Sequence, residues 1–257
     1  MENLVELVVQ GTGMDLWDFL LLCGVSFVGS FITAGLGIGG GLLVLASMAQ
    51  ILAPTTLIPI HAVVQLGSNT GRAILFFRNI FFTILPAFVV GTIIGAAVGA
   101  QVVVSLPKPV LQTILALFVL YATWAPKIQA GSPGNKTFFG VGIFGAFATM
   151  FIGASGTLVA PFVSAACKER NQFVATHATL MTIQHTLKIV AFGILGFAYG
   201  PFIPLLIGLI GFGFAGTFCG KLVLNRLPEH IFRKGLKIIL TLLAFRLIFA
   251  AITDYMG

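Results

Sequence analysis

Long apolar stretches run through almost the entire chain, and they constrain its fold more than any other feature. Hydrophobic residues make up 58% of the 257 residues and charged residues only 8%. A soluble domain carries about a quarter charged residues, because it needs them to cover its surface. The composition therefore excludes a soluble enzyme, a disordered segment and a free nucleic-acid-binding domain. It predicts an all-α polytopic membrane protein embedded in a lipid bilayer.

Charged residues, prolines and glycines divide the chain into ten apolar segments. Most of these segments approach the ~20 helical residues that cross a hydrocarbon core about 30 Å thick. The second and seventh are too short, at about 12 residues each, and they occupy matching places in the two halves. Such a pair is typical of the short broken or re-entrant helices at the centre of a transporter. The segments cover about residues 16–34, 41–53, 57–77, 80–104, 110–125, 137–152, 156–167, 173–197, 200–225 and 231–252.

The loop charges predict how the segments cross the membrane. If every segment, short ones included, carries the chain to the other face and the N-terminus is outside, nearly all basic loop residues are cytoplasmic and only Lys108 lies outside. If each short segment merges with its predecessor, the basic loops are divided between the two faces. The first assignment obeys the positive-inside rule and places both termini outside. Its cytoplasmic residues are Arg78, Lys127, Lys136, Lys168, Arg170, Arg226, Arg233 and Lys234.

A weak internal repeat relates the two halves. Each half makes five passes, an odd number, so a repeat must be inverted across the membrane. A shift of 116 residues aligns the halves without a gap over 44 positions, pairing His61 with His177 and the cation Arg72 with Lys188. An inverted repeat with sites at the repeat interface is a secondary-transporter architecture. Other matched pairs are Thr33 with Thr149, Gly37 with Gly153, Gly40 with Gly156, and Leu42 with Leu158.

The repeat also defines the domain organisation. Leu106-Pro107 and Leu227-Pro228 close corresponding loops at a longer offset, which indicates a short insertion. We therefore predict a first inverted repeat at residues 1–126, a cytoplasmic linker at 127–136 and a second inverted repeat at 137–257.

Polar residues recur on one face of the third and eighth segments, where they would lie inside the membrane. Their steps of three and four residues place them on a single side of a helix. A cation at membrane depth is costly and marks a functional site unless it snorkels to the interface. The histidines fit either substrate contact or helix-to-helix hydrogen bonds. The predicted binding residues are His61, Gln65, Ser68, Asn69 and Arg72 in the third segment, and His177, Gln184, His185 and Lys188 in the eighth.

Small residues open both short segments, as Gly35 to Gly41 and as Gly153-Ala154-Ser155-Gly156-Thr157. Glycine lets the backbone turn sharply at membrane depth, and the following helix points its free N–H groups at whatever fills the cavity. Two such helix N-termini with two cations nearby favour an anion, whereas the alternative reading is close helix packing. This adds Gly39, Gly40, Gly41, Ser155, Gly156 and Thr157 to the predicted binding residues.

Carboxylates are missing from the apolar segments. All seven acidic residues lie in loops or at segment ends, so no buried carboxylate is available to bind Na⁺ or relay protons, as a cation carrier usually requires. Proton coupling would have to use His61, His177 or His185. The three cysteines show no metal-ligand spacing, so we expect neither a metal nor a cofactor. The sequence leaves the oligomeric state open, a homo-oligomer included.

In these motifs the sequence resembles the TauE/SafE family of sulfite exporters and 4-toluene sulfonate uptake permeases. The resemblance rests on the Gly35 to Gly41 run, its counterpart at Gly153 to Thr157, and the polar residues from Asn69 to Arg72. It covers essentially the whole chain. It implies a permease of a prokaryotic plasma membrane that moves anions such as sulfite or organosulfonates. The residues themselves support an anion, and only the resemblance supports sulfur.

Two other functions compete with an anion permease that works by alternating access. Gly153-Ala154-Ser155-Gly156 followed by His177 and His185 looks like the serine motif of rhomboid intramembrane proteases, although the matching position in the first half is Gly39. A channel for small anions is the third reading, and unitary currents would distinguish it. We predict a transporter rather than an enzyme.

Overall fold

The computed structural model describes residues 12–36, 39–103, 106–126, 129–223 and 229–256. Within these ranges the chain forms ten α-helices joined by loops and three 3₁₀ turns, with no strand. The predicted all-α fold is confirmed, and each helix overlaps one predicted apolar segment. The helices are α2 (Leu16–Leu36), α3 (Gly40–Met48), α4 (Pro54–Leu75), α5 (Leu85–Val103), α6 (Lys108–Trp124), α7 (Asn135–Ile152), α8 (Gly156–Ala166), α9 (Arg170–Ile194), α10 (Ile203–Val223) and α11 (Glu229–Met256).

Helix length and polarity distinguish three groups among these elements, and α6, an apolar helix of 17 residues, is intermediate in length. Helices α2, α5, α7, α10 and α11 are long and apolar enough to cross a membrane, which confirms a polytopic membrane protein. Helices α4 and α9 are as long, at 22 and 25 residues, but carry the polar faces. Helices α3 and α8 have 9 and 11 residues. At 1.5 Å per residue they reach about half the hydrocarbon thickness, so the predicted short helices are confirmed.

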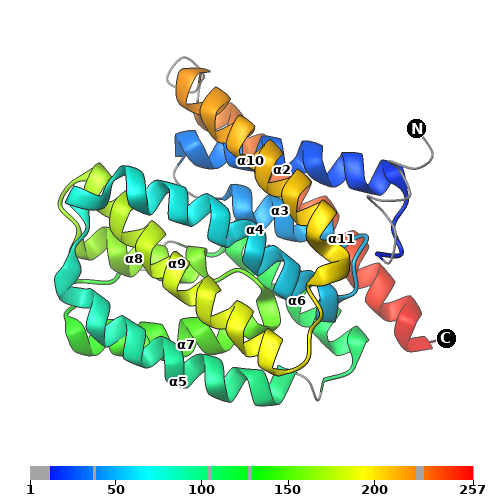
Figure 1. Cartoon of the computed structure of the whole chain (residues 1–257), viewed down its shortest axis with the longest axis horizontal. Helices are drawn as coiled ribbons and strands as arrows, with labels where there is room; N and C mark the ends of the chain where they lie inside the picture. Colours follow the sequence, from blue (N-terminus) through cyan, green and yellow to red (C-terminus); the bar gives the residue numbers. More distant parts are fainter. Residues whose placement is uncertain (1–11, 37–38, 104–105, 127–128, 224–228, 257) are drawn as a thin grey trace.

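The polar helices α4 and α9 lie at the centre of the bundle. In Figure 1 they run between a pair formed by α2 and α10 and a second pair formed by α5 and α7, and these pairs pack closely. Helices α4 and α9 run in opposite directions. The start of α4, at Thr55, lies beside Leu195 after the end of α9, whereas Phe81 beyond the end of α4 donates its N–H to Thr176 Oγ1 near the start of α9.

Glycines bring the backbones of the two outer pairs into contact at matching places. A methyl group at Gly95 of α5 would overlap the carbonyl oxygen of Ile143 in α7, and one at Gly216 of α10 would overlap that of Phe27 in α2. Ile143 lies 116 residues after Phe27, the offset of the repeat, and Gly216 follows Gly95 at the longer offset of the Leu-Pro loops. The same close approach therefore occurs in both pairs.

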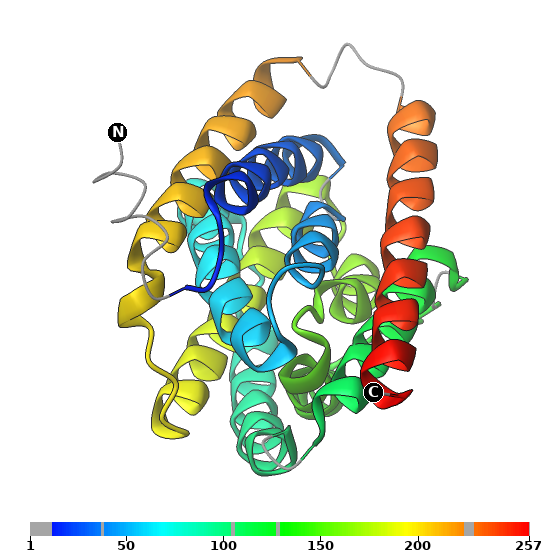
Figure 2. The same ribbon diagram turned by 90° about the vertical axis from the view of Figure 1, so that its right-hand side faces the viewer.

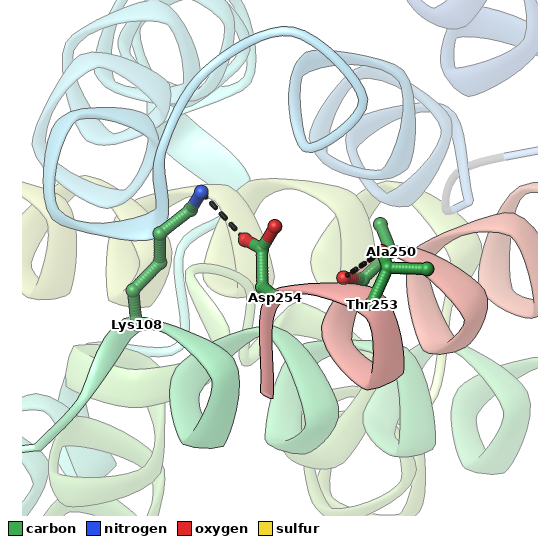
Figure 3. A network of polar contacts seen from close by, with 4 residues as sticks. All are labelled: Lys108, Ala250, Thr253 and Asp254. Atoms are coloured by element: carbon green, nitrogen blue, oxygen red, sulfur yellow. Dashed lines mark hydrogen bonds and ion pairs between the residues drawn. The ribbon is translucent and has the colours of Figure 1, made fainter. Parts of the chain in front are cut away.

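Helices α6 and α11 pack against each other along the outside, and Figure 2 shows α11 flanking the bundle. Trp124 at the end of α6 donates its indole N–H to Thr241 Oγ1, at 2.9 Å. At the other end, Lys108 Nζ pairs with Asp254 Oδ2 at 2.6 Å, as Figure 3 shows. These contacts make α6 and α11 antiparallel and place Lys108 and the end of α11 at one face of the bundle.

Several features used in the sequence analysis lie outside the described residues. They include two of the seven acidic residues (Glu2 and Glu6), part of the Gly35 to Gly41 run, two basic loop positions and the second Leu-Pro pair. The positions concerned are Gly37, Ile38, Lys127, Arg226, Leu227 and Pro228.

Candidate functional site

Two glycine turns place the starts of α3 and α8 deep in the bundle. Gly39, which precedes α3, has φ of 105°, and Gly153, which follows α7, has φ of 71°. Residues with a Cβ rarely adopt this part of φ/ψ space, so glycine is the residue that lets the chain break there. The N–H groups of the first turn of each short helix have no partner within the helix.

Two histidines contact the backbone of these turns. His61 Nε2 lies 3.0 Å from the carbonyl oxygen of Gly41, and its Nδ1 lies 3.3 Å from that of Gly153. His177 Nε2 lies 3.0 Å from the carbonyl oxygen of Gly156. Each histidine therefore contacts a carbonyl oxygen in the first turn of the short helix of its own half, Gly41 in α3 and Gly156 in α8.

Lys188 is fully buried and also contacts the second turn. Its side chain has no exposed surface, and its Nζ donates to the carbonyl oxygen of Gly153 at 2.6 Å and to Thr149 Oγ1 at 3.2 Å. The Gly153 carbonyl is thus contacted by both Lys188 and His61. A buried ammonium requires such partners, because an isolated charge in the interior is very costly.

A small cavity lies where the two short helices meet α4 and α9. We call it the central cavity, and its volume is about 60 Å³. Its lining contains imidazole, guanidinium, amide and hydroxyl groups but no carboxylate. The lining residues are Thr33, Gly39, Gly41, Leu42, His61, Gln65, Asn69, Arg72, Ala154, Gly156, Thr157, His177, Met181 and His185.

Two residues that line the central cavity each have a buried polar atom without a hydrogen-bond partner. His185 Nδ1 and Thr157 Oγ1 are both buried and make no hydrogen bond. Among the residues that the structure describes, four buried side-chain atoms lack a partner in this way. His185 is 3% exposed, and its ring meets that of His61 edge-on at 6.3 Å between centroids. Buried polar groups in proteins are almost always paired, so unpartnered ones at a cavity point to a ligand.

Arg72 supplies the cationic wall of the central cavity. Its Nε donates to the Ser68 carbonyl oxygen at 3.2 Å and its Nη2 to Asn69 Oδ1 at 2.9 Å, both within α4. A guanidinium has five N–H donors, so these two bonds fix its position and leave other donors available. The Asn69 amide donates in turn to the Gln65 carbonyl oxygen at 2.8 Å.

A second cavity, of about 80 Å³, adjoins the central one between α2, α3, α4 and α10. The two cavities share Thr33, Gly41, Gln65 and Arg72. The rest of the second cavity is mostly apolar, with Val44, Val64, Leu209, Ile210 and Phe214 in its walls. Arg72 therefore borders a polar space on one side and a largely apolar space on the other.

The structure brings most of the predicted site residues to the central cavity. Of the others, Gly40 and Ser68 line the second cavity. Lys188, Gln184 and Ser155 line neither, because Lys188 is bonded to the turn and the Ser155 hydroxyl is buried and donates to Gln184 Oε1. The predicted residues that line the central cavity are Arg72, Asn69, His185, Gln65, His61, His177, Gly39, Gly41, Gly156 and Thr157.

Four lining residues were not predicted: Thr33, Leu42, Ala154 and Met181. Thr33 carried a signal, because the repeat pairs it with Thr149, which accepts a hydrogen bond from Lys188. Leu42 and Met181 are apolar and carry no recognisable chemistry in a hydrophobic sequence.

The described residues contain no group of three histidine, cysteine or carboxylate side chains placed to hold a metal ion. Ser155 is also the candidate nucleophile of the protease reading. Its hydroxyl is bonded to a glutamine rather than an imidazole, so it lacks the adjacent base that activates a serine.

Comparison with known families gives one match over nearly the whole chain. The family model of sulfite exporter TauE/SafE matches residues 22–247. The chain belongs to this family. Its members are transporters, which places this TauE/SafE protein among membrane transporters and not among enzymes. Comparisons with curated proteins and with solved structures give no match.

Proposed function

We propose that this TauE/SafE protein is a permease for a small sulfur-containing anion, sulfite or an organosulfonate, which binds in the central cavity. One observation carries the proposal: a cavity without carboxylates, bordered by Arg72 at the meeting point of two helix N-termini, is lined by two residues that each have an unpartnered polar atom. Helix N-termini and guanidinium groups both favour negative charge. The sulfur chemistry comes from the family alone.

The donors around the central cavity suit an oxyanion. Thr157 contributes a hydroxyl, and His185 contributes Nδ1 when that nitrogen carries the proton. The first-turn amides of α3 and α8 add backbone N–H groups, and Arg72 adds its remaining donors. Lys188 does not contact the central cavity itself. It holds the Gly153 turn and adds positive charge near the start of α8 without lining the cavity.

The volumes of the cavities suit a small substrate. Because a water molecule needs about 10–15 Å³ of such volume, the 60 Å³ of the central cavity holds about four to six water-sized groups. Sulfite, with four non-hydrogen atoms, fits this space alone. The organic part of a sulfonate would extend past Arg72 into the second cavity, whose walls are apolar.

The transport mechanism we propose is alternating access between two inverted repeats, residues 1–126 and 137–257. Two pairs of corresponding helices support an inverted relation, since α4 runs antiparallel to α9 and α6 to α11. The matching glycine contacts of the outer pairs, at Gly95 and Gly216, support the repeat itself. The positive-inside rule places residues 127–136 in the cytoplasm and both termini outside a prokaryotic plasma membrane.

Transport of labelled sulfite into proteoliposomes tests the proposal. Arg72→Gln should lower the rate by about tenfold to a hundredfold, because a hydrogen bond to a charged group contributes about 1.5–3 kcal/mol. Arg78→Gln is the matched control, since Arg78 is exposed and lies outside both cavities. Equal rates for the two variants, or no transport of any sulfur anion by the wild type, would overturn the proposal.

A further inference from the structure

The two short helices occupy matching places in the halves but lie in different surroundings. Every residue of α3 except Gly41 is buried, and α3 belongs to the main hydrophobic core. In α8 only Val159, Ala160 and Val163 are buried. Met48 and Ser164 are separated by the 116-residue offset of the repeat, yet Met48 has no exposed surface and Ser164 is exposed. The two short helices are therefore covered unequally, since α3 is buried and much of α8 is not.

A larger cavity lies beside α8, and we call it the vestibule. Its volume is about 580 Å³, and its lining comes from α8, the end of α6, the start of α9, the loop at Gln129 to Gly131, and Arg233 of α11. Ser164, Gln129 and Arg233 are among its polar lining residues. Thr157 lines both the vestibule and the central cavity. Thr157, whose hydroxyl has no hydrogen-bond partner, therefore belongs to the wall between the two spaces.

The vestibule reaches the loop between α6 and α7, which contributes Gln129, Ala130 and Gly131 to its lining, and we call the face of the bundle that carries this loop the linker face. The second cavity lies toward the same face, because Leu75 and Thr217 from the C-terminal parts of α4 and α10 line it. At the opposite face, a cavity lined by Thr55 and Leu111 shares no residue with the central cavity. The spaces that adjoin the central cavity thus both lie toward the linker face.

We propose that the vestibule is the aqueous path between the central cavity and the linker face, with Thr157 as the residue that the anion passes. The inference rests on the proposed function, and the positive-inside rule makes the linker face cytoplasmic. The buried surroundings of α3 are the closed counterpart of this path. In a transporter built of inverted repeats, the opposite state exchanges the environments of corresponding elements. That state would bury the Ser164 side of α8 and open the Met48 side of α3.

Single-cysteine labelling tests the path. In a background with Cys23, Cys167 and Cys219 replaced by alanine, Ser164→Cys is compared with Met48→Cys, its partner in the repeat. Lys108→Cys and Ser132→Cys, both at exposed positions, mark the two faces. A charged, membrane-impermeant methanethiosulfonate is applied to right-side-out and everted vesicles. It reacts with thiolates, which form in water and not in lipid.

The proposal predicts that Ser164→Cys reacts from the same side as Ser132→Cys and that Met48→Cys stays unmodified. Should Met48→Cys fail to fold, Ala49→Cys and Ala165→Cys form a second matched pair, buried and exposed respectively. Reaction of Ser164→Cys with N-ethylmaleimide but not with the charged reagent would identify a lipid-facing surface and overturn the path. Reaction from the Lys108 side, or equal reaction of the two partners, would also overturn it.

Transport separates this inference from the proposed function. Complete modification of Ser164→Cys should abolish sulfite transport, because the added group obstructs the vestibule, and full transport after modification would overturn the path. If the labelling pattern holds but the unmodified protein moves no sulfur anion, the path stands and the substrate assignment fails.

Discussion

Lys188 Nζ donates a hydrogen bond of 2.6 Å to the carbonyl oxygen of Gly153, so a buried cation holds the turn at which α7 ends. Its counterpart in the repeat, Arg72, makes its two side-chain bonds within α4 and borders two cavities. The two cations therefore occupy one position of the repeat and have different partners. In this structure Arg72 is placed to meet a substrate, whereas Lys188 supports the backbone.

Lys188→Ala should destabilise the protein more than Arg72→Ala. The first substitution empties a fully buried site and removes two hydrogen bonds, a change that costs about 2–4 kcal/mol. Arg72 is only partly buried and bonded within its own helix, so its removal should cost less than about 1 kcal/mol. Thermal unfolding of both variants in the same detergent measures the difference. The reverse order would contradict the supporting role of Lys188.

Gly216→Ala should destabilise the bundle, and Gly211→Ala in the same helix should not. A methyl group at Gly216 would overlap the carbonyl oxygen of Phe27, whereas nothing lies within 4 Å of one at Gly211. Overpacking of this kind costs about 1–3 kcal/mol. Gly95→Ala and Gly140→Ala repeat the comparison in the other pair of helices, where Gly140 is the open position. Equal unfolding temperatures within each comparison would show that the helices do not approach as closely as described.

Ser155 should not react with a fluorophosphonate. Its side chain is fully buried, and its hydroxyl donates to Gln184 Oε1 instead of a histidine nitrogen, so no base activates it. Gel fluorescence after incubation with a fluorescent fluorophosphonate measures the reaction, and Ser155→Ala supplies the background signal. Labelling of the wild type above that background would restore the protease reading.

Much of the fold was predictable from the sequence, because the membrane leaves few choices. A chain with so few charges must satisfy its backbone hydrogen bonds in helices, and ~20 residues are needed for each crossing. The short helices α3 and α8 were therefore evident from length alone. The polar face from His61 to Arg72 was also evident, because helical spacing alone places these residues on one side of α4.

Only the tertiary structure decided how equivalent residues are used. The sequence by itself determined an all-α membrane protein, two short central helices, and a cation at one position of each half. It did not determine that Arg72 borders the central cavity while Lys188 is bonded to Gly153, or that Met48 is buried while Ser164 is exposed. The physical reason is that corresponding residues share a position along their helices, whereas burial and bonding depend on which neighbouring helices pack against them.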